Sequence, residues 1–304
     1  MVVKLSQPRR LAGHTWVVNE SEAIEVFSEV RPRLFGVAYR MLGSVSDAED
    51  MVQEVWLRWQ TYDRSKVNDP AAFLITTATR LCINELQSAR HRRETYVGPW
   101  LPDPVDTSSD TTLGAERVEA LELVTLLVME KLLPAERAAY VLREAFDYPY
   151  AKIAQIIRVS EANARQLVSR ARKHVAGNRR VAVDVAQQRN LLAAFLDAAV
   201  NGEMAALEEL FVDDVVSYTD GNGVRNAARF PVVGRTTVAK FITVFRERVF
   251  SAAQFTWVTA NNQPAVIVSH ADGTFETFIA LTTTPEGISQ VLWHRLEDKV
   301  KHLL

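Results

Sequence analysis

The sequence predicts a multidomain protein in which two all-α domains precede one α+β domain. Apolar residues recur at helical spacing through most of residues 20–180, which indicates packed amphipathic helices. From about residue 184, helical segments lead into short stretches of alternating or β-branched residues, a pattern typical of strands. A length of 304 residues also exceeds that of one ordinary domain.

The first all-α domain is expected over residues 20–97, after an N-terminal tail of residues 1–19. Ser46-Asp47-Ala48-Glu49 has the form of a capping box and predicts the start of a second helix after Gly43. Asp69-Pro70 predicts the start of a third helix, because proline is tolerated in the first turn.

Residues 98–112 are dense in Pro, Ser, Thr and Asp, which predicts a linker rather than a helix. The second all-α domain is expected over 113–180, with a leucine-rich helix over 113–131 and short helical segments after it. The α+β domain is expected over 184–304. Its predicted helices cover 187–200 and 204–211, and its predicted strands lie near 215–219, 255–260, 264–270, 274–284 and 287–293.

Composition excludes several classes of protein. With 48% apolar residues the chain can bury sizeable cores, so disorder is not expected. No apolar run approaches the roughly 18 residues of a membrane span, and the start of the chain lacks the apolar stretch of a secretory signal. The single cysteine, Cys82, excludes an internal disulfide and fits a reducing compartment. We therefore expect a cytoplasmic protein without a membrane partner.

The most informative segment is residues 150–175. The net charge of the chain is −2, but residues 150–180 hold eight Lys/Arg and one acidic residue, as a phosphate-binding surface would. Ile153 and Ile156 give a first short helix an apolar face, and Ser160 can cap a second helix. Two short helices joined by a tight turn describe a helix-turn-helix, whose second helix enters the major groove. The residues expected to face DNA are Asn163, Arg165, Gln166, Ser169, Arg170, Arg172 and Lys173.

Arg, Asn and Gln have the donors that match guanine and adenine edges, although a solvated helix face is the simpler alternative. The segment also resembles region 4 of extracytoplasmic-function (ECF) sigma factors, which binds the promoter −35 element. The resemblance rests on Leu133-Pro134, Leu142-Arg143-Glu144, Ile153-Ala154, Ser160-Glu161 and Ser169-Arg170-Ala171-Arg172. It implies that Arg165 and its neighbours enter the groove. Leu167 stands where many members have a basic residue, so it is not counted as a DNA contact.

Residues 34–59 resemble regions 2.1 and 2.2 of the same family. Acidic and polar side chains share this segment with an apolar side that includes Val55 and Trp59. The resemblance implies docking on basic helices of the largest subunit of core RNA polymerase, because opposite charges favour association. The residues implied to dock are Asp50, Gln53 and Glu54. Acids in the first helical turn, such as Asp47, also complement the helix dipole, but Glu54 lies beyond that turn.

The third predicted helix, residues 70–92, has one apolar and one polar face. Its resemblance to regions 2.3 and 2.4 implies that it recognises and melts the promoter −10 element, where unstacking costs about a few kcal/mol per step. The residues implied to contact this element are Arg80, Asn84, Gln87, Arg90, His91, Arg92 and Arg93.

The part of the chain beyond residue 180 resembles, from residues 195–223 onward, a SnoaL-like (nuclear transport factor 2-like) domain. That fold is a curved sheet wrapped by helices around a cone-shaped cavity. A subgroup of ECF sigma factors carries such a domain together with a Trp-Leu-Pro-acid-Pro signature, here residues 100–104. The subgroup's Asp-Gly-Gly-Gly-Lys motif is altered to DGNGV at 220–224, and its Asn-Pro-Asp-Lys-Leu motif survives only as LEDKV at 296–300. The residues implied to join the domains are Trp100, Leu101, Pro102, Asp103, Pro104, Asp220, Gly221 and Gly223.

The signature also has a physical reason to dock. Trp100 and Leu101 are large apolar side chains in a proline-bounded segment with no helix of its own, so their burial requires another part of the chain. We expect the C-terminal domain to hold this segment, as a ligand bound in cis at high effective concentration. The alternative is that Trp100 packs on the helices of the first domain.

The C-terminal domain carries candidate catalytic bases by residue type, namely Asp220, His270 and His294, and Tyr218 could orient one of them. Their spacing forms no triad and no metal site. We expect no catalytic residues, no metal and no cofactor, while a small-molecule ligand in the cavity stays open. The domain is expected to regulate the chain from within, so that no separate anti-sigma factor is required.

Two other functions stay open on the sequence alone. One is a helix-turn-helix regulator that acts without polymerase and has no need of the 34–60 surface. The other is a SnoaL-like enzyme with a DNA-binding appendage.

Overall fold

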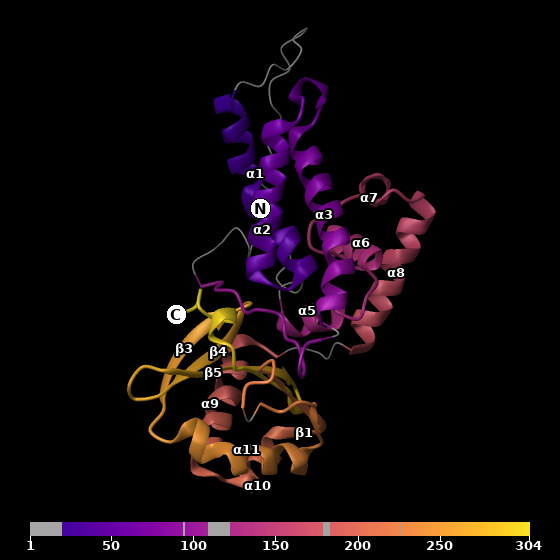
Figure 1. The fold of residues 1–304 in the computed structure, drawn as a ribbon. Helices are drawn as coiled ribbons and strands as arrows, with labels where there is room; N and C mark the ends of the chain where they lie inside the picture. Colours follow the sequence, from indigo (N-terminus) through magenta and orange to yellow (C-terminus); the bar gives the residue numbers. More distant parts are fainter. Residues whose placement is uncertain (1–19, 94, 109–121, 179–182, 226) are drawn as a thin grey trace.

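The computed structural model describes residues 20–93, 95–108, 122–178, 183–225 and 227–304, except the side chains of 89–93 and 177–178. The predicted N-terminal tail lies outside these residues, as do parts of the linker and of the leucine-rich helix. Figure 1 shows the helices of the N-terminal half stacked on the C-terminal sheet domain, with linker residues between them. The predicted fold class, all-α domains followed by an α+β domain, is confirmed.

The first helical domain consists of α1 (Glu20–Leu42), α2 (Val45–Thr61) and α3 (Pro70–Arg93), with the 3₁₀ helix η1 (Arg64–Lys66) before α3. The predicted capping box at Ser46 is wrong. Ser44 is the N-cap of α2, and its Oγ accepts a hydrogen bond from the Asp47 backbone N at 3.3 Å. α3 begins at Pro70, as the sequence predicts, and the Asp69 carboxylate caps it by accepting from the Ala72 backbone N at 2.9 Å.

The second helical domain comprises α5 (Leu123–Met129), α6 (Pro134–Glu144), α7 (Tyr150–Ile157) and α8 (Glu161–Asn178). α7 ends at Arg158, which has a left-handed backbone with φ of 59°. Ser160 then caps α8, its Oγ accepting from the Asn163 backbone N at 3.2 Å. The pair α7–α8 therefore forms the predicted helix-turn-helix. No helix in the described residues has both the length and the apolar character needed to cross a membrane.

The two helical domains share one apolar core. α6 packs against α1 and α3, and α7 packs against α3. Buried side chains of both domains form one continuous cluster. Leu34 and Cys82 of the first domain belong to it, as do Leu142 and Ile153 of the second. In this structure the helix-turn-helix is therefore held beside α3.

The C-terminal domain is a six-stranded sheet with the strand order β2-β1-β6-β5-β4-β3. Its strands are β1 (Phe211–Asp220), β2 (Val232–Val233), β3 (Gln254–Ala260), β4 (Gln263–Ser269), β5 (Phe275–Thr284) and β6 (Gly287–His294). Its helices are α9 (Val185–Asn201), α10 (Met204–Leu210) and α11 (Arg235–Phe250), with the 3₁₀ helix η3 (Glu297–Lys299) near the end. Neither α11 nor the short strand β2 is among the elements predicted from the sequence.

The two faces of the sheet are covered by different parts of the chain. α9, α10 and α11 pack on one face around Phe195 and Val215. The other face forms a second apolar cluster with Leu101 of the linker, Leu123 of α5 and Val300 near the C-terminus. Because linker and α5 residues complete this cluster, the C-terminal domain contacts the linker and the second helical domain.

Strand register places two of the predicted functional residues side by side. β1 and β6 are parallel, and Asp220 pairs with His294 at their carboxyl ends. The Arg295 backbone N donates to the Asp220 carbonyl at 2.8 Å and closes this end of the sheet. The side chains of Asp220 and His294 are completely buried. The linker runs directly over these two side chains.

Candidate nucleic-acid, polymerase and interdomain surfaces

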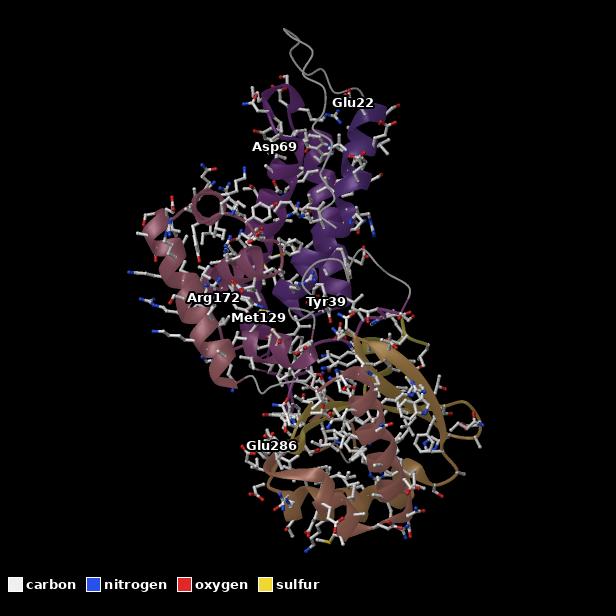
Figure 2. All side chains as sticks on the ribbon, turned by 180° about the vertical axis from the view of Figure 1, so that it is seen from behind. Glu22, Tyr39, Asp69, Met129, Arg172 and Glu286 are labelled. Carbon is white, nitrogen blue, oxygen red and sulfur yellow. The ribbon has the colours of Figure 1, made fainter. Side chains whose placement is uncertain are left out.

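All seven residues predicted to face the −35 element are exposed on α8. Figure 2 shows side chains of α8, the helix on which Arg172 is labelled, projecting from the edge of the molecule. Leu167 is buried, in keeping with its exclusion from the predicted DNA contacts. The opposite side of α8 belongs to the shared apolar core, so the exposed row is the face that the fold leaves for a partner.

Two arginines of this row are held by neighbouring acids. Arg165 forms an ion pair with Glu161 one turn earlier, and its guanidinium lies 4.8 Å from the centre of the Tyr150 ring. Arg172 binds Glu144 of α6 at 2.6 Å. These pairs are on the surface, where an exposed ion pair contributes only about 0–1 kcal/mol, so phosphate or base contacts can replace them.

The predicted polymerase surface lies on α2. Asp50 and Gln53 are exposed, and Glu54 is partly exposed and accepts a hydrogen bond from Arg58 at 2.7 Å. Asp50 also lines an open groove of about 770 Å³ between α2 and the C-terminal end of the chain, which contributes Lys301 to the same groove.

The predicted −10 surface on α3 is only partly available. Asn84 and Gln87 are exposed. Arg80, in contrast, donates from Nε to the Ile156 carbonyl at 2.8 Å and from Nη2 to the Gln155 carbonyl at 3.1 Å. It contacts the end of α7 and is not an open nucleic-acid contact. The side chains of Arg90, His91, Arg92 and Arg93 lie outside the described residues.

The interdomain contact centres on the carboxylate of Asp220. Its Oδ2 accepts from the Leu101 backbone N at 2.7 Å and from Lys299 Nζ at 2.8 Å. Its Oδ1 accepts from the Tyr96 hydroxyl. Asp220 is completely buried, so an ion pair and two neutral donors compensate the charge that burial would otherwise make costly.

The Trp100 side chain packs on both neighbouring domains. The Lys299 ammonium lies 4.4 Å from the centre of its ring, in a cation–π contact. On the other side, a β-carbon added at Gly43 between α1 and α2 would lie 2.8 Å from the ring, so the ring rests on that turn. Trp100 remains partly exposed, whereas Leu101 is completely buried. Both sequence-based interpretations of Trp100 therefore describe part of its surroundings.

Residues 102–104 alternate between the two domains. The Pro102 carbonyl accepts from His294 Nε2 at 2.8 Å, and the Pro104 carbonyl accepts from His302 Nε2. Asp103 Oδ2 caps α2 by accepting from the Val45 backbone N at 2.9 Å, while its Oδ1 lies 3.5 Å from Lys299 Nζ of the C-terminal domain.

Asp103 also has backbone contacts with the first helical domain. Its carbonyl accepts from the Tyr39 hydroxyl at 2.6 Å, and its backbone N donates to the Gly43 carbonyl at 2.8 Å. Figure 2 shows Tyr39 where the first helical domain approaches the C-terminal domain. The linker is thereby bound to the first helical domain on one side and to the sheet domain on the other.

The turn after Asp220 requires glycine at two positions. A β-carbon on Gly221 would lie 2.5 Å from the Ala227 β-carbon, and Gly223 has a φ of +81° that side chains rarely adopt. Asn222, which stands where the related motif has glycine, accepts from the Val97 backbone N at 3.2 Å. The altered motif therefore still contacts the linker.

Comparison with known proteins assigns the chain to a family. Residues 26–92 match the model of Sigma-70 region 2, and residues 124–175 match that of Sigma-70 region 4. The sequence is 41% identical over 224 residues to the ECF RNA polymerase sigma factor SigJ of Mycobacterium tuberculosis, covering 72% of each chain. The chain is an ECF RNA polymerase sigma factor.

Two further comparisons extend this assignment. The probable ECF RNA polymerase sigma factor SigI of Mycobacterium tuberculosis is 35% identical over 196 residues, covering 62% of this sigma factor and 67% of that chain. The crystal structure of Mycobacterium tuberculosis SigJ superposes with a TM-score of 0.74 at 31% identity, covering 92% of this chain and 98% of the other. The match includes the C-terminal part, so the sigma factor has a SnoaL-like domain after regions 2 and 4.

The candidate catalytic bases of the SnoaL-like domain have structural partners. Asp220 and His294 hold the linker, and burial lowers the pKa of His294 to about 4. His270 follows β4 and lies 3.3 Å from Glu276 of β5, whose carboxylate also pairs with Arg295 at 2.9 Å. The cavity between α11 and the sheet is about 30 Å³, roughly the share of one water molecule and far below the volume of a small-molecule site.

Several residues of the interdomain contact escaped the sequence analysis. Tyr96, Lys299 and His302 bind the linker or Asp220 directly. Asn261 donates to the Tyr39 hydroxyl at 2.8 Å and accepts from the Val105 backbone N at 2.9 Å. Of these four residues, only Lys299 could have been found from the sequence, because it is the lysine retained in the altered LEDKV motif.

We expect Arg165→Ala and Arg172→Ala each to weaken binding of the sigma factor to −35 duplex DNA. Each change removes a base or phosphate contact worth about 1–3 kcal/mol. Fluorescence anisotropy with a promoter fragment measures the loss, and Arg189→Ala in α9, an exposed arginine away from α8, serves as the matched control. Unchanged affinity for both α8 variants would contradict the placement of this helix in the groove.

Proposed function

We propose that this sigma factor binds the −35 element with α8 and the −10 element with α3, and that it docks on core RNA polymerase through α2. The observation that carries this proposal is the exposed row of polar and basic side chains on α8, the second helix of a helix-turn-helix. Such a row presents guanidinium and amide donors to base edges and phosphates. Membership of the sigma factor family supports the remaining assignments.

We further propose that the SnoaL-like domain sets the activity of the sigma factor by holding the linker. Asp220, His294 and Lys299 bind residues 101–102, while Asp103 caps α2 of region 2. Any movement of this domain therefore acts directly on the turn where the predicted polymerase surface begins. A regulator built into the chain would do the work of a separate anti-sigma factor, and it needs no catalytic activity.

The polymerase assignment predicts a strong effect of charge reversal on α2. In the Asp50→Lys, Glu54→Lys double variant, like charges would face basic helices of the polymerase, at a cost of several kcal/mol, and affinity for core enzyme should fall about a hundredfold or more. Binding to isolated −35 duplex should not change. Glu247→Lys is the matched control, because this acid is 84% exposed at the far side of the SnoaL-like domain.

Run-off transcription with core enzyme tests the function as a whole. The wild-type chain should support initiation at its promoter, and the α2 variant should not. If the chain binds promoter duplex but never directs core enzyme to initiate, it is a helix-turn-helix regulator instead. If the α2 variant retains wild-type affinity for core enzyme, the docking surface lies elsewhere.

A further inference from the structure

A groove separate from the cavity beneath α11 lies on the linker side of the C-terminal sheet. Its volume is about 520 Å³, within the range of roughly 300–1,000 Å³ that small-molecule sites occupy. Linker residues 98–100, one side of α5, and the face of β1 and β6 with the loop before β2 form its walls. Figure 1 shows α5 where the two halves of the molecule meet. We call this the junction groove.

The junction groove and the cavity beneath α11 lie on opposite faces of the sheet. Thr219 and Trp293 line the cavity beneath α11, whereas Tyr218 and Gln290 line the junction groove. Successive residues of a strand point to opposite faces, so the two sites are separated by the sheet itself. A ligand in the junction groove therefore contacts the linker and α5, which the cavity beneath α11 does not reach.

Backbone contacts fix the linker wall of the groove. Gly98 has a φ of +97°, which side chains rarely adopt, and a β-carbon added there would lie 3.5 Å from the Ala228 carbonyl oxygen. Two residues after Trp100 begins the groove wall, the chain is anchored again, and the Leu101 amide is held by Asp220. The linker wall is therefore formed before any ligand arrives, which lowers the entropy lost on binding.

The groove has positive charge and no carboxylate. Lys131 of α5 and Arg229 of the loop before β2 line it, and no acidic side chain does. Neither cation has a hydrogen bond or an ion pair with another of the described residues. The larger groove beside α2, in contrast, is lined by acids that include Asp50 and Asp298. Unpaired positive charge in a partly enclosed site favours an anionic ligand.

The rest of the lining is largely flat and apolar. The Tyr218 hydroxyl has no hydrogen-bond partner among the described residues, and burial raises its pKa, so it stays protonated and can donate. Aromatic and aliphatic side chains of this kind pack well on a planar ring. The apolar and aromatic lining residues are Pro99, Trp100, Leu127, Val128, Tyr218 and Pro231.

We propose that the junction groove binds an organic anion with a flat apolar body, such as an aromatic carboxylate or phosphate. Lys131 and Arg229 attract its acidic group, and its body packs on α5 and the linker. Because Lys131 belongs to region 4 and Arg229 to the SnoaL-like domain, the ligand joins these two domains across the linker. The site does not depend on the proposed promoter contacts, but its coupling to the linker deepens the regulatory role proposed for the SnoaL-like domain.

A pair of dyes tests the need for negative charge. Anilinonaphthalene sulfonate has a flat apolar body and one sulfonate, and N-phenylnaphthylamine has the same rings without the charge. In fluorescence titrations the wild-type chain should bind the sulfonate at least about tenfold more tightly than the neutral dye. Naphthoate or naphthyl phosphate should displace it, and the stronger competitor identifies the preferred acidic group. Equal affinity for the two dyes, or no saturable binding, would overturn the proposal.

Charge removal tests the location of the site. Lys131→Gln and Arg229→Gln should each lower affinity for the sulfonate by about three- to tenfold and leave the neutral dye unaffected. Both side chains are exposed, so the variants should fold as the wild type does. Lys240→Gln in α11, an exposed lysine on the helix-covered face of the sheet, is the matched control. Unchanged sulfonate binding in both groove variants would place the dye elsewhere and refute the proposal. Weaker binding of these variants to −35 duplex would assign the two cations to DNA instead.

Hydrogen exchange tests whether the ligand joins the domains. With the sulfonate at ten times its dissociation constant, exchange of the Leu101 amide should slow about tenfold, because release of the linker takes the site apart. The neutral dye at the same concentration should have little effect. Bound sulfonate with unchanged Leu101 exchange would show that the ligand does not join the domains. Run-off transcription without dye tests the sigma factor function separately, so either proposal can fail without the other.

Discussion

Asp220→Ala should release the linker from the SnoaL-like domain, at a cost of about 3–5 kcal/mol to their association. The change leaves the Lys299 ammonium, 14% exposed, without its closest carboxylate. It also removes the acceptor of the Leu101 backbone N and of the Tyr96 hydroxyl. Removing one partner of a buried, hydrogen-bonded ion pair costs more than the pair contributes, because the remaining charge stays desolvated.

Hydrogen exchange measures this release at the residue concerned. The Leu101 amide donates to Asp220 and is shielded with it, so its exchange should accelerate by a factor of about 100 or more in the variant. Run-off transcription should change as well, since the linker also caps α2. Asp213→Ala is the control on the same strand, where the carboxylate is 93% exposed and pairs with Arg235 on the surface. Unchanged exchange at Leu101 would show that Asp220 does not hold the linker.

The linker contact could be predicted from the sequence, because its large apolar side chains cannot be buried within the linker itself. Trp100 and Leu101 stand among prolines with no helix or strand in which to bury their side chains, and Leu101 indeed completes the apolar cluster on the sheet. The role of Asp220 as the acceptor of the linker could be predicted only from the resemblance to the sigma factor subgroup with a SnoaL-like domain. An Asp-Gly pair at the end of a strand is also an ordinary turn. The contacts of Tyr96 and Asn261 could not be predicted, because single polar residues in loops follow no periodic pattern.

Helix α11 shows where periodicity alone was insufficient. Val238, Ala239 and Ile242 are buried at helical spacing. The helix begins at Gly234, which gives no side-chain cap, and its first turn contains two threonines, which occur more often in strands. The first-turn proline that predicted the start of α3 has no counterpart here, and packing against the sheet decides the conformation.

The contact between Arg80 of α3 and the end of α7 could not be predicted from the sequence for a different reason. The acceptors of Arg80 are backbone carbonyls, which every residue has, and they lie 76 and 75 positions further along the chain. The amphipathic pattern of α3 correctly separated its apolar and polar faces. It contained no information on which partner covers the polar face when DNA is absent.

Acidification should destabilise the contact between the linker and the SnoaL-like domain through His294. Burial lowers the pKa of this imidazole from 6.5 to about 4, with opposing contributions from the Asp220 carboxylate, which favours the proton, and the Lys299 ammonium, which disfavours it. Between these two pH values the unfolded chain binds a proton that the folded chain does not. Stability from this group is therefore complete above pH 6.5 and falls as the pH is lowered toward 4, by about 3 kcal/mol.

Urea unfolding at a series of pH values measures this loss, and His294→Gln isolates it from the titration of carboxylates. A glutamine amide can still donate to the Pro102 carbonyl, which His294 Nε2 contacts at 2.8 Å, but it cannot take up a proton. Between pH 6.5 and 4, the free energy of unfolding should fall less in the variant than in the wild type. The difference should equal the contribution of His294, about 3 kcal/mol. If wild type and His294→Gln lose stability in parallel, the buried imidazole is not the group that makes this interface sensitive to acid.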